Sequence, residues 1–165
     1  MIAASLIPEF DHEIASLRKT LERLPEDKYD WKPHDKSMSL QALAAHLAEM
    51  VGWCTMTLKT PELDFATFPY QPFRPANNGE LLAFLDERTK EARAALEAAS
   101  DTDMMTPWTI RNGENVFMTL PRVGMLRSMV FNHIVHHRGQ LTVYMRILNV
   151  PVPALYGPSA DEGAM

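Results

Sequence analysis

The sequence NHIVHHRGQLTVYMRIL, residues 132–148, combines a strong helical pattern with three of the chain's six histidines. When the segment is extended back to Arg122, apolar or histidine side chains recur every three or four residues, as on one face of a helix. This stripe consists of Leu126, Val130, His133, His137, Leu141 or Gln140, Tyr144 and Leu148. Asn149 and Pro151 then supply a stop signal. The longest helix is therefore predicted from about Arg122 to about Leu148.

His133 and His137 are four residues apart, so their side chains project from one face of this helix about 6 Å apart. His46 lies between Leu43 and Met50 on the apolar stripe of another predicted helix and also faces inward. Three inward-facing imidazoles without a shared ion would bury several polar rings without assured partners. We therefore predict one metal site formed by His46, His133 and His137, with His136 offset from it.

Three further helices are indicated by apolar residues at helical spacing. The first follows a stripe over residues 6–24 and ends at Pro25, and the second runs from Ser39 to about Lys59. The third begins at a capping Asn78 and ends near Ser100. Between the second and third helices, residues 61–77 contain four prolines, which predicts a loop.

Between the third and last helices, TPWTIRNGENVFMTLP (residues 106–121) has the pattern of a β-hairpin. Asn-Gly is the dipeptide preferred in a two-residue type I′ turn, which places the turn at Asn112-Gly113. The predicted cross-strand pairs are Arg111 with Glu114, Thr109 with Val116, and Trp108 with Phe117. The expected fold is all-α: a four-helix bundle in one domain, residues 1–165, with a small β-hairpin before the last helix.

The charge balance excludes some partners. Sixteen basic residues are outnumbered by 21 acidic ones, giving a net charge of -5, so neither nucleic acid nor an anionic membrane is an expected partner. The single cysteine, Cys54, is interpreted as a core thiol in a reducing compartment. With no signal-peptide pattern and no apolar run of about 20 residues, we expect a cytoplasmic protein.

Three segments resemble the DinB-like family, also described as DinB/YfiT-like metalloenzymes. They are WKPHDKSMSLQALAAHLAEM at 31–50, NHIVHHRGQLTVYMRILNVPVP at 132–153 and YGPSADE at 156–162. The H-x-x-x-H-R-G-Q element is the most specific part. The resemblance implies a homodimeric up-down-down-up four-helix bundle. It also implies that His46, His133 and His137 bind a divalent ion, with nickel or zinc expected first and iron or manganese as alternatives.

Three imidazoles leave a coordination position for water or a substrate, which is the arrangement of a catalytic site. Helix 122–148 lacks the glutamate of an H-E-x-x-H element, because Ile134 stands there. Among the activities that the resemblance implies, this favours transfer of a low-molecular-weight thiol to a small electrophile. The alternatives are a metal-dependent hydrolase with Glu49 or Asp161 as base, and a metal-binding stress protein without turnover.

Overall fold

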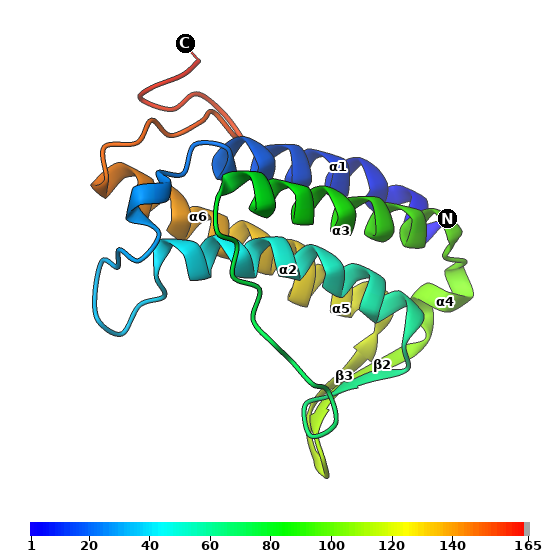
Figure 1. The fold of residues 1–165 in the computed structure, drawn as a ribbon. Helices are drawn as coiled ribbons and strands as arrows, with labels where there is room; N and C mark the ends of the chain where they lie inside the picture. Colours follow the sequence, from blue (N-terminus) through cyan, green and yellow to red (C-terminus); the bar gives the residue numbers. More distant parts are fainter. Residues whose placement is uncertain (164–165) are drawn as a thin grey trace.

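The structure is a computed structural model that describes residues 1–163, and it is mainly helical, as predicted. Within this range, long helices lie side by side, and a small three-stranded sheet stands beside the C-terminal end of one of them, α2 (Figure 1). The long helices are α1 (Ile2–Leu21), α2 (Leu40–Lys59), α3 (Asn78–Ala98) and α6 (Asn132–Ile147). The shorter elements are η1 (Glu26–Lys28), β1 (Glu62–Asp64), α4 (Asp101–Met105), β2 (Pro107–Asn112), β3 (Asn115–Pro121), α5 (Arg122–Met125) and the π-helical η2 (Leu126–Phe131).

The long helices share one apolar core. Both α1 and α2 pack against α3 and α6. Inward-facing side chains such as Phe10, Leu47, Leu85 and Leu141 are completely buried in this core. Cys54 belongs to it as well, as predicted, and burial raises the pKa of its thiol to about 12. Removal of this apolar surface from water is the main force that holds the helices together. Among residues 1–163, none of the helices combines the length and apolarity needed to cross a membrane.

Polar side chains set the beginning of α2 and α3. The hydroxyl of Ser39 accepts a hydrogen bond from the backbone N–H of Ala42 at 3.1 Å, as expected of an N-cap. The cap of α3 is Asn77, whose side chain accepts from the N–H of Glu80 at 2.9 Å. The prediction of Asn78 as the cap was wrong by one residue, because the Asn78 side chain instead bonds to groups in the connection after α1.

The last helical segment has the predicted limits but is not a regular α-helix throughout. The six residues of η2 form π-helix between α5 and α6. A π segment carries more residues per turn than an α-helix, so it rotates everything after it relative to the predicted stripe. In α6 the buried residues are Ile134, Arg138, Leu141 and Met145. His133 and His137 therefore lie at the edge of the core, half-buried, and not on its most buried stripe.

The hairpin is present, but its predicted register was wrong. Asn112 pairs with Asn115, so Gly113 and Glu114 occupy the turn. Gly113 has φ of +59°, and a glycine with positive φ at the first central position is the pattern of a type II′ turn. The backbone N–H of Gly113 also donates to the Asp64 carboxylate at 2.9 Å. This contact with a distant segment fixes the turn one residue later than the dipeptide preference predicts.

The shifted turn changes every predicted pair. Thr109 lies opposite Thr119 and Trp108 opposite Leu120, and the ladder is irregular between Ile110 and Arg111. The loop predicted over 61–77 also contains a short strand, β1, which pairs in parallel with β2. Leu63 in the middle of β1 is buried in a small apolar cluster with Trp108 and Ile110. Burial of this one side chain explains a strand that the neighbouring prolines argued against.

Arg138 of α6 is a charged residue in the core. Its side chain is 2% exposed, and the side chain of its partner, Glu13 on α1, is 8% exposed. Nη2 of Arg138 lies 2.7 Å from Oε2 of Glu13. Arg138 also donates to the backbone carbonyl of Glu13 and to the hydroxyl of Tyr156. That hydroxyl in turn donates to the Glu13 carboxylate at 2.7 Å. The closed network joins α1, α6 and the segment after α6.

We expect Arg138→Met to destabilise the protein by about 3–5 kcal/mol, because it leaves the Glu13 carboxylate buried without its cation. The double variant Glu13→Leu, Arg138→Met should regain most of this loss, since both charges are then absent. Urea unfolding measures both values. Arg146→Met is the matched control: its partner Asp161 is on the surface, and the loss should be much smaller. An Arg138→Met loss no larger than that of the control would contradict the role assigned to the network.

Candidate metal centre

The three histidines predicted to form a site come together between α2 and α6. One ring nitrogen from each of His46, His133 and His137 lies within 4.8 Å of the other two. Ring centroids are 5.5 Å apart for His46 and His133, 5.0 Å for His46 and His137, and 4.6 Å for His133 and His137. The packing of α2 against α6 brings residue 46 beside residues 133 and 137, which are one helical turn apart. All three imidazoles therefore face one point.

Trp53 forms one wall of the cluster. It lies two turns after His46 on α2, and its ring centroid is 5.6 Å from that of His46 and 5.8 Å from that of His133. All three histidines are half-buried. Because the indole covers one side and the three histidines are only half-buried, the cluster is partly shielded from bulk water but still accessible.

Burial keeps two of the imidazoles uncharged. The pKa of His46 is lowered from its usual 6.5 to about 4, first by burial and then by the neighbouring His137 and His133. The pKa of His133 is lowered by burial and by His137, against an opposing effect of the backbone carbonyl of Met129. Metals bind the neutral imidazole, so at neutral pH these rings are in the form that a metal site needs.

Gln140 orients the third imidazole, a role that sequence reasoning missed. Its side-chain oxygen lies 2.7 Å from Nδ1 of His137 and accepts the hydrogen of that nitrogen. Nε2 of His137 then carries its lone pair, and it faces Nε2 of His133 at 2.9 Å. Partners of this kind fix the tautomer and direction of metal-binding histidines. The signal was in the sequence, since an amide three residues after a histidine on a helix is within reach.

The other histidines are separate from the cluster. His136 is exposed and receives a hydrogen bond from the side-chain amide of Gln140 at 3.1 Å, so it points to the outer side of α6. His12 is exposed beside Tyr156, with ring centroids 5.7 Å apart, and His34 is exposed in the connection between α1 and α2. In the described range 1–163, His46, His133 and His137 are the one set of His, Cys, Asp and Glu side chains close enough to share an ion.

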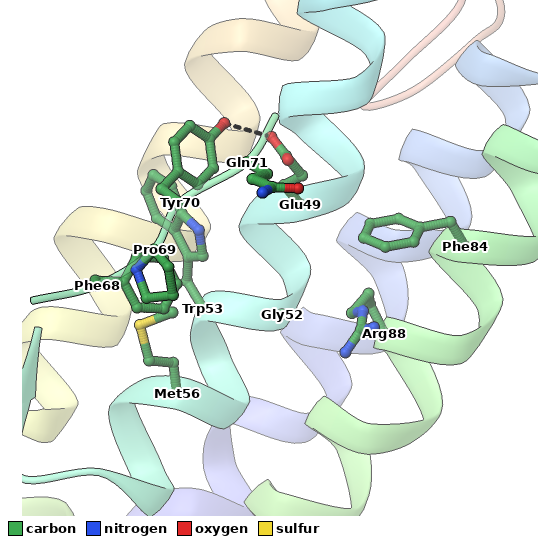
Figure 2. A pocket seen from close by; sticks show the side chains of 10 residues that line it. All are labelled: Glu49, Gly52, Trp53, Met56, Phe68, Pro69, Tyr70, Gln71, Phe84 and Arg88. Atoms are coloured by element: carbon green, nitrogen blue, oxygen red, sulfur yellow. Dashed lines mark hydrogen bonds between the residues drawn. The ribbon is translucent and has the colours of Figure 1, made fainter. Parts of the chain in front are cut away.

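Glu49 lies one turn after His46 but serves to hold the chain after β1. Its carboxylate accepts a hydrogen bond from the Tyr70 hydroxyl at 3.0 Å (Figure 2). It also accepts one from the backbone N–H of Phe73 at 2.8 Å. Burial, and then Glu49, raise the pKa of Tyr70 to about 12. The irregular segment between β1 and α3 is thus fastened along the outside of α2, where Figure 1 shows it running from the sheet to α3.

Asp161, the other carboxylate considered as a base, is not part of the cluster. One of its oxygens accepts from Arg146 at 3.2 Å, and the other accepts both from Arg146 at 2.6 Å and from the backbone N–H of Val152 at 2.8 Å. These contacts hold the pKa of Asp161 below its usual value, first through Arg146 and then through Val152. Asp161 therefore fastens the C-terminal segment to the end of α6.

A cavity of about 390 Å³ opens beside His46. Glu49 and Tyr70 separate it from a second hollow of about 350 Å³ between α2 and α3, which Figure 2 shows with Trp53 on one side and Arg88 on the other. The first cavity is lined by polar as well as apolar groups, including the cations Lys32 and Arg74. It is within the size range of small-molecule sites, about 300–1,000 Å³. A small polar molecule in this cavity thus reaches His46.

Comparison with known proteins agrees with this architecture. YrdA of Bacillus subtilis (strain 168), an uncharacterized protein, is 24% identical over 162 residues, which cover 96% of this chain and 90% of YrdA. The crystal structure of the DinB-like protein YjoA from Bacillus subtilis superposes with a TM-score of 0.71 at 18% identity, covering 90% of this chain and 96% of YjoA. A DinB-like protein from Bacillus cereus ATCC 10987 gives a TM-score of 0.68 at 22% identity, covering 92% and 95%.

At these identities the two crystal structures establish likeness of fold alone. Family membership rests on the sequence itself, because residues 5–164 match the model of the DinB family. The matched range includes all three histidines of the cluster and the sheet as well as the long helices. The chain belongs to the DinB family.

Proposed function

We propose that His46, His133 and His137 bind one divalent ion, nickel or zinc, and that the protein is a metal-dependent enzyme on a four-helix bundle. The observation that carries the proposal is the convergence of three ring nitrogens within 4.8 Å. In a tetrahedral site with metal–nitrogen distances of about 2.1 Å, ligand nitrogens are roughly 3.4 Å apart. The 2.9 Å between Nε2 of His133 and Nε2 of His137 needs only a small opening to reach that value.

We propose transfer of a low-molecular-weight thiol to a small electrophile as the reaction. A divalent ion held by three imidazoles supplies an open position at which a thiol is bound in its deprotonated form. The chain's own residues support this class over hydrolysis. The carboxylate of Glu49 holds Tyr70 and Phe73, and that of Asp161 is occupied by Arg146, so neither is a free general base for water. The cavity beside His46 offers space for the thiol compound.

The first test is metal content. We expect about one divalent ion per chain in the purified protein, and near-complete loss of it in the double variant His46→Ala, His137→Ala, which removes two of the three ligands. Elemental analysis of both proteins measures this. His136→Ala is the matched control, since His136 neighbours the cluster but points outward, and it should keep its metal. Unchanged metal content in the double variant would disprove the site.

The second test concerns Gln140. Replacement by Ala removes the acceptor that fixes the His137 tautomer, and we expect metal affinity to fall roughly 10–100-fold. Gln140→Glu keeps an acceptor and should retain most of the affinity. Competition with a chromophoric chelator gives the affinities. If the Ala and Glu variants bound metal equally well, orientation by Gln140 would be excluded.

The third test is turnover. Metal-loaded protein is incubated with an electrophile and a small thiol, and separately with activated esters without thiol. We expect metal-dependent consumption of the electrophile only when thiol is present, because no free carboxylate stands ready to activate water. Ester hydrolysis without thiol, lost in Glu49→Gln, would assign the protein to the hydrolases. Metal binding without turnover in either assay would support the non-catalytic alternative.

A further inference from the structure

A further cavity, distinct in chemistry from the one beside His46, adjoins the histidine cluster. It measures about 270 Å³ and lies between α2, the sheet and η2. Its walls are almost entirely apolar. They include Trp53, Met56, Trp108, Ile110, Met118 and Met129. A cavity lined in this way holds water poorly, because it offers few hydrogen-bond partners.

The cavity and the cluster have a wall in common. Trp53 lines the cavity, and the same ring lies against His46 and His133. Met129, on another side of the cavity, is one turn before His133 in the chain. A molecule seated in the cavity is therefore only one side chain away from the imidazoles.

The mouth of the cavity is apolar and exposed. Phe65, just after β1, and Phe117 on β3 line it, are 50% and 56% exposed, and have ring centroids 6.5 Å apart. Exposed aromatic side chains grouped around an apolar hollow are costly in water and mark sites where an apolar ligand binds. The opening thus admits a group without charge.

The volume limits what this group can be. At about 270 Å³ the cavity is below the range of about 300–1,000 Å³ that holds a whole drug-sized ligand. It has room for one or two rings or a short branched chain. The occupant is then one part of a molecule, and the rest of that molecule must extend outside the cavity.

We infer that the cavity binds the apolar group of the electrophilic substrate, whose reactive end lies at the histidine cluster. This inference rests on the proposed metal-dependent function and adds the substrate class: a small electrophile with an uncharged aromatic or branched aliphatic group. The more polar cavity beside His46, with Lys32 and Arg74 in its lining, remains for the thiol compound.

The test uses two metal-binding probes that differ only in an apolar group, acetohydroxamate and 3-(2-naphthyl)propanohydroxamate. Each is titrated calorimetrically into zinc-loaded protein. We expect the naphthyl probe to bind roughly tenfold more tightly or better, since each buried CH₂ unit contributes about 0.8 kcal/mol. Met118→Trp fills the cavity and should abolish this difference without changing acetohydroxamate binding.

Val116→Trp is the matched control, because Val116 is exposed on the same strand but does not line the cavity. It should retain the full preference for the naphthyl probe. Equal binding of both probes to the wild-type protein, or equal loss of the preference in both Trp variants, would overturn the inference. If neither hydroxamate bound zinc-loaded protein, the open metal site itself would be refuted.

A measurement on metal-free protein distinguishes the proposal for the apolar cavity from the proposal for the metal site. In metal-free protein, 2-naphthaleneethanol should quench tryptophan fluorescence, since Trp53 and Trp108 both line the cavity. Because Met118→Trp adds a tryptophan, binding of the alcohol to this variant is measured by calorimetry. Its thermal unfolding is recorded to establish that it is folded. Binding of the alcohol to metal-free protein, together with failure of both hydroxamates to bind zinc-loaded protein, would establish the cavity and refute the metal function. Absence of binding would count against the cavity alone.

Discussion

The contact between α2 and α6 is the constraint on which the candidate site depends. His46 belongs to one helix and the other two histidines to the second, so neither helix alone forms a cluster. The side chains of Ala44, Ala45 and Ala48, around His46 on α2, are buried and small, and side chains of this size let neighbouring helices approach closely. The energy for this approach comes from the apolar core, because imidazoles side by side contribute little attraction of their own.

Arg138 determines which side of α6 the histidines take. It follows His137 directly, and successive residues of an α-helix are separated by about 100° around its axis. With Arg138 held inward by Glu13, His137 cannot also lie at the centre of the core. The buried ion pair therefore turns the imidazoles to the edge of the helix packing, where a small molecule reaches them. The same interaction that costs desolvation in the core keeps the candidate site accessible.

The sequence predicted the elements that depend on local patterns. Approximate helix limits followed from apolar periodicity and from prolines, although α1 ends at Leu21, before Pro25. The histidine set followed from i, i+4 spacing together with the stripe containing His46. The features that were predicted wrongly, the hairpin turn and the strand β1, depend on contacts between distant segments. The turn at Gly113 is fixed by Asp64, and the strand around Leu63 is fixed by a side chain buried against β2. Neither contact leaves a periodic signal in the sequence.

The π segment before α6 shows why the histidines were found although their environment was not. A change in helical register between Leu126 and Phe131 alters the direction of every later side chain by the same angle. The relation of His133 to His137 is unaffected, so the two rings still lie together on one face, as their spacing predicts. Their relation to the core did change, and a basic residue, Arg138, took the inward position that the stripe had given to histidine.

The position of the histidine cluster at the edge of the core bears on the proposed transfer reaction. A cluster at the centre of the core would admit one ligand along one path, whereas this cluster adjoins a polar cavity beside His46 and an apolar cavity beyond Trp53. A transfer reaction needs two different molecules at one point, and differences in polarity can keep each in its own place. Trp53 then has a positioning role, since it separates the apolar cavity from the imidazoles while lying against two of them. An arrangement with two chemically unlike approaches favours a two-substrate transfer over the hydrolysis of a single substrate.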